Sequence, residues 1–465
     1  MSKSKNIEMI TGDPKKAIIK LALPMMLSML LIMLYNLADS IWVAGLGADA
    51  LAAIGFITPL FMVLVGLGNG IGAGANSLIA RNIGAENYAQ ANNAGLHAIL
   101  LSVIVSIIFT ILIEVLMVPI LELMGAGESI GFALDYSYII FGFLIIFVYS
   151  GVASAIFRSE GDMKRATIAI AVTAILNIIL DPIFIYVLNL GISGAAWATV
   201  ISAFISCIIM SYWIWGKKDL YLDLSRKNFD FQKSLMFDIL QVAIPSTLET
   251  IVFSALAIIV NSMLVIVSGT TAVAVYTASM RIVQMAMIPL IGLGTAVLTV
   301  AGVAFGAHNY ENLKTAHSYS IKLGFIISIA LGAVMYLFSP QIATMFSYTK
   351  ASASLLPEIA TAISILSLFV VAVPHGIMSS MMFQGVGKGT YSLLITLLRS
   401  LILESVFAYI FTFIFGWGVI GVYLGLLVGC FVGGTIGYVW AKFFIKKFKD
   451  ISIRKYSPKK TSSEN

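Results

Sequence analysis

The sequence predicts an all-α integral membrane protein, with twelve transmembrane helices arranged as two parallel six-helix repeats and both termini in the cytoplasm. Three observations support this fold class: long apolar runs, the distribution of basic residues, and an internal duplication. Of the 465 residues, 60% are hydrophobic and only 11% are charged, and the mean hydropathy is +0.99. This composition excludes an ordinary soluble globular domain.

Apolar runs of about 20 residues are long enough to cross a ~30 Å hydrocarbon core as helices. The expected spans are 17–45, 51–80, 93–121, 132–158, 165–188, 191–214, 237–267, 271–304, 315–338, 355–384, 389–415 and 417–446. The opening MSKSKNIEMITGDPKK is too polar for a signal-peptide core, so the first helix is expected to be retained. The resulting parts are an N-terminal arm (1–16), an N-lobe (17–214), a linker (215–236), a C-lobe (237–446) and a basic tail (447–465).

Basic residues gather on one side of the expected bundle. With the N-terminus in the cytoplasm, 25 of the 28 Lys and Arg residues fall in or beside cytoplasmic segments, the exceptions being Lys350, Arg281 and Arg399. This positive-inside pattern accounts for the net charge of +6 without a nucleic-acid partner. The tail could also touch anionic lipid, although a topology signal is the simpler interpretation. The charged linker is expected to be a partly amphipathic cytoplasmic surface segment.

Cysteine and histidine offer no metal or disulfide framework. Cys207 and Cys430 lie in apolar spans without ligand spacing, and the four histidines are scattered singly. Neither a structural zinc site nor a set of disulfides is therefore expected.

An internal duplication divides the chain into halves. The segment GLGNGIGAGANSLIARNIGAENYAQANNAG in the second span matches IPLIGLGTAVLTVAGVAFGAHNYENLKTAHS at an offset of 222 residues. The identities at this offset are Gly70, Gly72, Gly84, Ala85, Asn87, Tyr88 and Ala94 with Gly292, Gly294, Gly306, Ala307, Asn309, Tyr310 and Ala316. Because each half holds an even number of helices, the repeats are parallel, and a substrate site is expected near their interface.

Two carboxylates lie inside apolar spans of the first half. Asp39 is 19 residues past Lys20, roughly 28 Å along the helix axis, and Asp181 is 16 past Arg165, roughly 24 Å. Thr199 in the sixth span reaches about the same depth. A carboxylate in hydrocarbon is costly, so by default it indicates function.

Both acids have polar companions on the same helix face. Asn177 lies four residues before Asp181, and Tyr35 four before Asp39, with Asn36 beside it. Pro182 should kink the fifth helix and free a carbonyl. These oxygen ligands suit Na⁺ or a shared proton. Alternatively, both acids could be bonded to backbone or amide partners that only fix helix packing.

The second half does not preserve this cluster. Asn261 stands in place of Asp39, and Glu404 in place of Asn177. A structural ion pair with Arg399 or Arg281 is the simpler interpretation of Glu404. Glu249 could contact a cationic substrate or form a second coupling site. His375 is expected to be a hydrogen-bonded core residue.

Methionine is frequent, with 21 residues, and one of its clusters, ASMRIVQMAMIPL, contains Met285 and Met287. Flexible thioethers can repack around ligands of varied shape, but they are also ordinary membrane filling.

Four segments resemble a known family: LALPMMLSMLLIMLYNLADSIWVAGLG, GLGNGIGAGANSLIARNIGAENYAQA, FRSEGDMKRA and NIILDPIFIYVLNLGISGAAWAT. They are similar to the multidrug and toxic compound extrusion (MATE) family, especially its DinF-type branch with archaeal members, over nearly the whole chain. The resemblance places an ion site in the N-lobe, at positions occupied here by Asp39, Asn177, Asp181, Thr199 and Tyr35, with Asn36 as a polar neighbour.

The resemblance implies a secondary antiporter in the cell membrane. Such a protein expels organic, often cationic and amphipathic compounds in exchange for H⁺ or Na⁺, without a cofactor, and is expected to function as a monomer. Its first helix, with Pro24, would bend when its Asp is protonated. Other branches carry a Glu about two turns after the proline of the seventh helix, whereas Glu249 lies four residues after Pro245. Their coupling role is therefore not assigned to Glu249.

Three other functions were weighed. A flippase for lipid-linked sugars would need several cavity cations, and only Arg281 and Arg399 are candidates. An intramembrane aspartyl protease would need Tyr-Asp and Gly-x-Gly-Asp, whereas Asp39 follows Ala38 and Asp181 follows Leu180. ATP-driven transport is disfavoured because GNGIGAG lies inside a span with no Lys-Ser/Thr after it.

Overall fold

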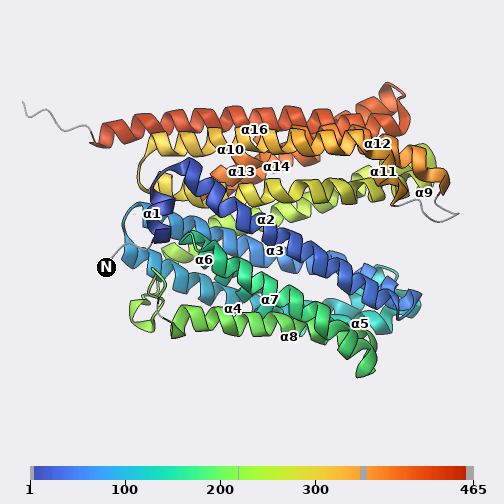
Figure 1. Ribbon diagram of the computed structural model, residues 1–465, viewed down its shortest axis with the longest axis horizontal. Helices are drawn as coiled ribbons and strands as arrows, with labels where there is room; N and C mark the ends of the chain where they lie inside the picture. The colour runs from blue at the N-terminus through green and yellow to red at the C-terminus, as the bar shows by residue number, and fades with distance from the viewer. Residues whose placement is uncertain (1–4, 218, 346–352, 457–465) are drawn as a thin grey trace, which may run out of the picture.

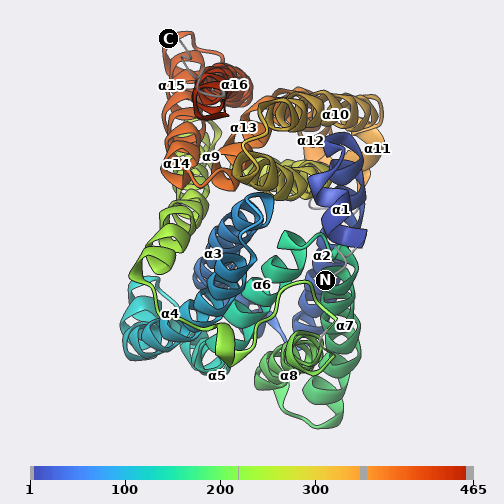
Figure 2. The same ribbon diagram turned by 90° about the vertical axis from the view of Figure 1, so that its left-hand side faces the viewer.

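The computed structural model describes residues 5–217, 219–345 and 353–456, and within these ranges every regular element is helical. Long helices lie side by side over the length of the molecule (Figures 1 and 2). Lys350 and residues 457–465 of the tail fall outside the described ranges.

The first half contains seven α-helices after a short N-terminal one, α1 (Lys5–Thr11). They are α2 (Pro14–Ala44), α3 (Ala48–Gly84), α4 (Tyr88–Leu123), α5 (Ile130–Gly142), α6 (Leu144–Ser159), α7 (Met163–Pro182) and α8 (Gly191–Ser211). Asp13, Asn87 and Asp162 begin α2, α4 and α7 by accepting hydrogen bonds from backbone N–H groups of the first turn. The segment that includes α5 and α6 bends by 48°.

Pro182 changes the helix that it ends. α7 passes directly into a π-helical turn over Ile183–Val187, closed by a bond from the Leu188 N–H to the Ile183 carbonyl at 2.9 Å. A proline lacks the N–H that would continue the regular ladder, so a wider turn follows it.

The second half begins with the longest helical segment, α9 (Lys233–Gly306). Two helices meet within it at Gly269, whose φ of 74° and ψ of −168° a residue with a Cβ adopts only with strain. The remaining helices are α10 (Tyr310–Leu337), α11 (Ser339–Thr344), α12 (Leu356–Ala372), α13 (Pro374–Gly385), α14 (Gly389–Thr396), α15 (Glu404–Tyr409) and α16 (Gly418–Tyr456). Of the described helices, nine are long and apolar enough to cross a membrane, or up to eleven when each bent pair counts as one span.

Two segments outside the apolar runs pack partly into the bundle. In the N-terminal arm, α1 buries Ile7 and Ile10, at 0% and 2% exposure. Between the π-helical turn that ends at Gly216 and the start of α9, the described part of the linker contains a 3₁₀ turn at Arg226–Asn228, exposes its charged residues and buries Leu222 and Leu224. Ile7 and Ile10 are three residues apart on a helix, and Leu222 and Leu224 are two apart in the linker, so each segment packs one apolar side onto the bundle.

The halves share a core at one end of the molecule. The helix α1, the linker and the end of α16 lie at this end, called here the linker end, and the opposite end is called the far end (Figure 1). The core of the first half continues into residues 293–321, 378–395 and 441–448 of the second. A separate core holds residues 260–290, 335–372 and 408–430. The halves are therefore most tightly joined at the linker end.

Candidate functional site

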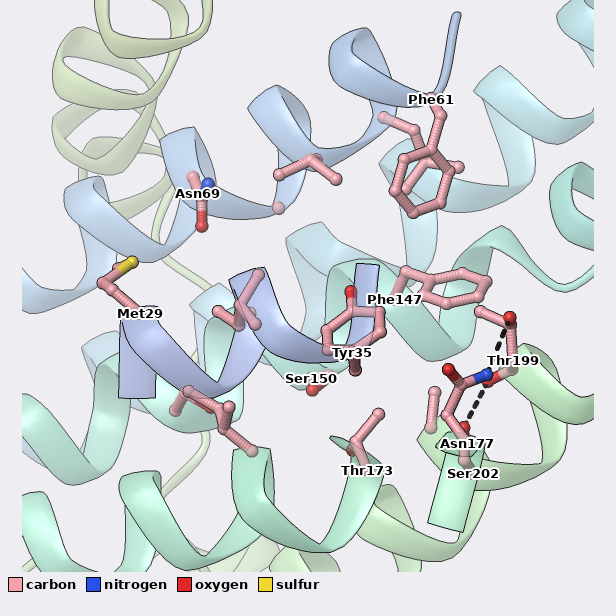
Figure 3. A pocket seen from close by; sticks show the side chains of 18 of the residues that line it. Met29, Tyr35, Phe61, Asn69, Phe147, Ser150, Thr173, Asn177, Thr199 and Ser202 are labelled. Atoms are coloured by element: carbon pink, nitrogen blue, oxygen red, sulfur yellow. Dashed lines mark hydrogen bonds between the residues drawn. The ribbon is translucent and has the colours of Figure 1, made fainter. Parts of the chain in front are cut away.

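A cavity of about 180 Å³ lies within the first half (Figure 3). Its walls come from α2, α3, α6, α7 and α8, and they are mostly apolar, with Met25, Met29 and Phe61 among them. Tyr35 and Asn177 contribute polar groups. Small-molecule sites have this kind of lining, apolar with a few convergent polar groups, but at about 300–1,000 Å³ they are larger than this cavity.

The polar end of the cavity is an acid–amide–hydroxyl chain. The Asn177 amide donates to Asp181 Oδ1 at 3.1 Å and to Thr199 Oγ1 at 3.2 Å, as Figure 3 shows for the second bond. Asn177 and Asp181 meet because they lie four residues apart on α7. Both are buried, at 1% and 0% exposure.

Three oxygens of this group are buried without a hydrogen-bond donor among the described residues: Asp39 Oδ1, Asn177 Oδ1 and Asp181 Oδ2. Asp39 and Asp181 are close enough to interact electrostatically. A buried polar atom without a partner is costly, so each such group calls for an explanation. Oxygen ligands of this kind fit a shared proton or a hard cation such as Na⁺.

The sequence reasoning missed Tyr136, from α5. Its side chain hydrogen-bonds to Thr199 and interacts electrostatically with Tyr35, Asp39 and Asp181. Counting its depth in the fourth span would have raised it as a candidate, but no charge drew attention to it.

Asn36 and Pro24 lie outside the cluster, and Pro24 is 15 residues before Asp39 on α2, roughly 22 Å along the helix axis. Asn36 is exposed on α2, and its backbone carbonyl accepts a hydrogen bond from Ser40 Oγ at 2.8 Å. The Pro24 carbonyl accepts bonds from Ser28 Oγ at 2.9 Å and Thr167 Oγ1 at 3.1 Å. The contact with Thr167 joins α2 to α7 close to the proline.

Glu249 belongs to a polar group within the second half. Its carboxylate accepts a bond from Ser392 Oγ at 2.6 Å and from the Gln384 amide at 3.3 Å. Arg399 is near enough to interact with it electrostatically. Glu249 is therefore held by side chains of its own half.

The ion pair expected for Glu404 is not formed. Within the described residues, neither Arg281 nor Arg399 lies within 4.0 Å of this carboxylate. Instead, Arg399 interacts with Glu404 electrostatically from beyond 4.0 Å, Ser400 and Cys430 lie beside the carboxylate, and the Arg399 Nε donates to Ser400 Oγ at 3.3 Å. A serine thus stands between the two charges.

The remaining candidates of the second half are separate. Arg281 and Met285 are exposed, while Met287 packs against the separate core of the second half. His375 contacts the Phe431 carbonyl and Thr435 Oγ1 at 3.1 and 3.2 Å, as expected of a hydrogen-bonded core residue. Met285 and Met287 therefore do not line a shared cavity on α9.

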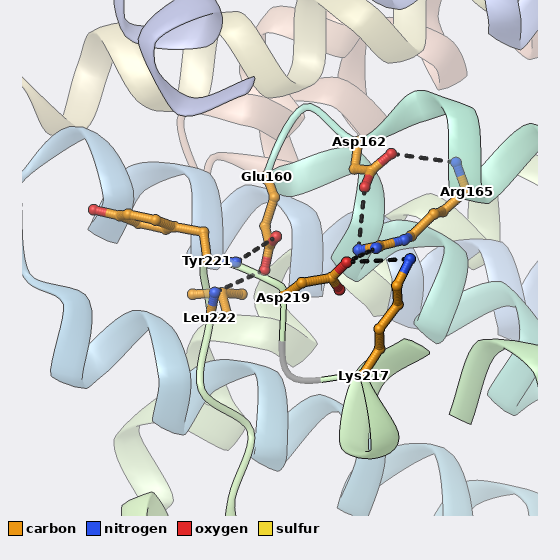
Figure 4. Close-up of polar contacts among 7 residues, drawn as sticks. All are labelled: Glu160, Asp162, Arg165, Lys217, Asp219, Tyr221 and Leu222. Carbon is orange, nitrogen blue, oxygen red and sulfur yellow. Dashed lines mark hydrogen bonds and ion pairs between the residues drawn. The ribbon is translucent and has the colours of Figure 1, made fainter. Parts of the chain in front are cut away.

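Another buried acid lies at the linker end, outside the spans. Glu160 follows α6 at 2% exposure and accepts hydrogen bonds from the backbone N–H groups of Tyr221 and Leu222, at 3.2 and 2.9 Å (Figure 4). Burial raises the pKa of Glu160 from 4.5 to about 7, although the two N–H groups oppose the shift.

An ion-pair group lies beside Glu160. Arg165 contacts Asp219 at 2.6 Å and Asp162 at 3.4 Å, and Lys217 contacts Asp219 at 3.5 Å (Figure 4). Desolvation raises the pKa of the Asp219 carboxyl, but hydrogen bonds and positive charge from Arg165 and Lys217 together outweigh it, so this pKa lies below its usual value. These contacts fix the start of the linker to the first half.

Comparison with known proteins identifies the family. The sequence model of the MatE family matches residues 24–183 and again residues 245–410, which together are more than half of the chain. The chain belongs to the MATE family. It is a multi-pass protein of the cell membrane and a transporter rather than an enzyme.

Relatives of this MATE protein carry transport names. A probable multidrug resistance protein, YoeA of Bacillus subtilis, is 28% identical over 65% of this chain and 66% of its own length. A protein named FAD transporter from Shewanella oneidensis is 25% identical over 71% of this chain and 74% of its own. A solved structure described as the outward-facing conformation of a multidrug resistance MATE transporter is 38% identical, with a TM-score of 0.94 over 97% of this chain and 100% of that one.

Proposed function

We propose that this MATE protein is a secondary active exporter that exchanges H⁺ or Na⁺ for organic, often cationic and amphipathic compounds. The observation that carries the proposal is the set of three unpartnered buried oxygens on Asp39, Asn177 and Asp181 beside an apolar cavity. The acids bind the ion, and the cavity receives the exported compound.

Ion entry and substrate export are coupled because the ion and the substrate use the same carboxylates. A loaded ion neutralises the carboxylates and removes the cost of their burial, whereas the unloaded acids attract an organic cation. Because the cavity is bounded by α2, a change in charge at Asp39 acts directly on the helix that contains Pro24. Ion and substrate thereby favour different conformations of one lobe.

The architecture that we propose retains twelve spans. Counting the two helices that meet at Gly269 separately raises the eleven candidate spans to twelve. The lobes are residues 17–214 and 237–446, with the linker 215–236 and both termini in the cytoplasm. The linker end then faces the cytoplasm, and the far end faces outward. One chain contains both lobes and the whole ion site, so a monomer suffices.

The conformation corresponds to closure at the cytoplasmic side. The shared core lies at the linker end, and the resemblance to a structure described as outward-facing supports the same assignment. Alternating access then requires the contacts of the linker end to separate.

The proposal is tested by efflux from proteoliposomes with an imposed pH or Na⁺ gradient. We expect Asp39→Asn and Asp181→Asn to lower gradient-driven efflux by about tenfold or more, because an amide cannot carry the coupled proton or charge. The gradient that drives the unmodified protein identifies the ion.

A matched control is Asp49→Asn, which removes an exposed carboxylate at the start of α3, away from the cavity. It should pump like the unmodified protein. Normal efflux by Asp39→Asn would refute the proposal.

Lipid-linked sugar transport is not favoured. Neither arginine suits a pyrophosphate in the cavity: Arg281 is exposed on α9, and Arg399 is buried in the second half. The efflux assay also includes anionic substrates, because one relative is named an FAD transporter.

A further inference from the structure

The glycines repeated at the offset of 222 residues have different contacts. Gly72 and Gly294 pack within their own lobes, against Gly151 and Met381 respectively. Gly70 and Gly292 face the opposite lobe, because a Cβ on Gly70 would meet α9 and a Cβ on Gly292 would meet α2. The duplication therefore preserves glycine where helices approach closely.

Gly84 and Gly306 differ from both of these pairs because they meet each other's helices. A Cβ on Gly84 would strike the backbone carbonyl of Val303, and a Cβ on Gly306 would strike that of Arg81. Arg81 and Val303 are themselves 222 residues apart. The contact is thus reciprocal, as it must be where two repeats cross on their symmetry axis.

One turn away, the same symmetry is visible. A Cβ on Gly302 would lie 3.0 Å from the Cβ of Ala80, which is its own repeat equivalent. Beside it, the Asn76 amide donates to Thr299 Oγ1 at 3.0 Å, and Ser77 Oγ donates to the Gly385 carbonyl at 2.9 Å. Close glycine packing and interlobe hydrogen bonds therefore occur together.

Two cavities lie on either side of this helix crossing, and they are related by the same repeat symmetry. One of about 250 Å³ is lined by Val300 and Asn312, and the other, of about 410 Å³, by Leu78 and Gln90. These residues are again 222 positions apart in pairs. Figure 2, which looks onto the linker end, shows α3 at the boundary between the halves.

We propose that the reciprocal crossing of α3 and α9 at Gly84 and Gly306 is the contact on which the lobes close at the linker end, and that it sets the balance between the two access states. This inference rests on the proposed alternating access. Hydrogen is the only side chain that lets the two backbones touch, and such contacts gain from Cα–H···O approach.

A methyl group at either glycine acts against backbone rather than against a flexible side chain. The helices must then separate, which removes the interlobe contacts of the closed linker end. Overpacking of this size commonly shifts an equilibrium about fivefold or more. The shift favours the state in which the linker end is open.

The test measures interlobe distances by double electron–electron resonance on the full chain in nanodiscs, without substrate. Spin labels at Ala89 and Glu311, both exposed at the linker end, report its opening. Labels at Asp49 and Thr271, exposed at the far end, report the converse motion. For Gly84→Ala and Gly306→Ala, we expect the long-to-short ratio at the linker end to rise about fivefold or more.

Two control glycines come from the same helices. Gly55 on α3 has open space around its Cβ position, and Gly294 on α9 faces the flexible Met381 within its own lobe. Gly55→Ala and Gly294→Ala should keep the distances of the unmodified protein. If Gly84→Ala does not fold, Gly302→Ala is a milder variant, because its neighbours need to move by only a few tenths of an ångström.

Folded Gly84→Ala and Gly306→Ala proteins with unchanged distances would overturn the inference, as would an equal shift in Gly55→Ala. The distance measurement does not depend on transport, so a failure of the glycine inference can be told apart from a failure of the ion-coupling proposal. Unchanged distances together with normal ion-driven efflux would refute the glycine crossing alone.

Discussion

Glu160 shows how a single buried side chain can carry a pH dependence outside the ion site. Its two backbone bonds favour the carboxylate, but removal from water outweighs them, and the pKa rises to about 7. In the unfolded chain the pKa returns to its ordinary 4.5. The folded state therefore binds this proton more tightly than the unfolded state does.

The free energy of unfolding should consequently be largest below pH 4.5 and fall as the pH rises to about 7. The contribution is at most about 3 kcal/mol. Glu160→Gln should remove this part of the dependence. Tm of the detergent-solubilised protein, followed by tryptophan fluorescence between these pH values, checks the prediction.

Glu311→Gln provides the comparison, because Glu311 is an exposed acid whose pairing with Lys314, at 4.0 Å, is weak. It should retain the dependence of the unmodified protein. A Glu160→Gln profile parallel to that of Glu311→Gln would contradict the assignment.

At the scale of elements, the linker is hydrogen-bonded along the first half, and these contacts with α4 are called here the strap. Asn93 on α4 binds the backbone of Asp230 in both directions, donating to its carbonyl at 2.7 Å and accepting from its N–H at 3.2 Å. His97 accepts from the Gln232 N–H at 3.0 Å and stacks with Phe231. The linker is therefore bound to the first half up to the residue before α9.

Asn93→Ala should loosen this strap without disturbing the bundle. Loss of two hydrogen bonds costs about 1–2 kcal/mol locally, so we expect trypsin to cleave at the exposed Arg226 and Lys227 roughly 5- to 30-fold faster. Limited proteolysis followed by mass spectrometry measures the rate. Asn36→Ala, on the exposed face of α2, should cleave like the unmodified protein, and equal rates in both variants would exclude the strap.

For the whole molecule, the asymmetry between the lobes matters more than their likeness. The first half has two acids with unpartnered oxygens, whereas Glu249 in the second half is bonded to Ser392 and Gln384. Duplication supplied a common scaffold, and substitutions at a few positions gave the two lobes different chemistry.

The orientation of the molecule gives its own prediction. Lys227→Cys lies at the linker end and Asp49→Cys at the far end, and both native residues are exposed. A membrane-impermeant maleimide should label Asp49→Cys in intact cells and Lys227→Cys only after permeabilisation. The native Cys207 and Cys430 are buried, so the background is low. The reverse pattern would invert the topology.

Much of the site could be predicted because its polar residues lie at helical spacing within single segments of the sequence. Asn177 and Asp181 share a face at four residues' separation, and their bond at 3.1 Å follows from helix geometry alone. Tyr136 was missed because its role depends on how α5 is rotated against α8. Glu160 was missed for a similar reason, since only the path of the linker buries it.

The sequence by itself determined the membrane class, the apolar runs, the internal repeat and the two acids of the first half, because run length, charge and periodicity are properties of a single segment. Only the tertiary structure decided which oxygens are left without donors, that Ser400 separates Arg399 from Glu404, and that Gly84 and Gly306 meet at the linker end. These depend on helix rotation and tilt, which packing between distant segments sets.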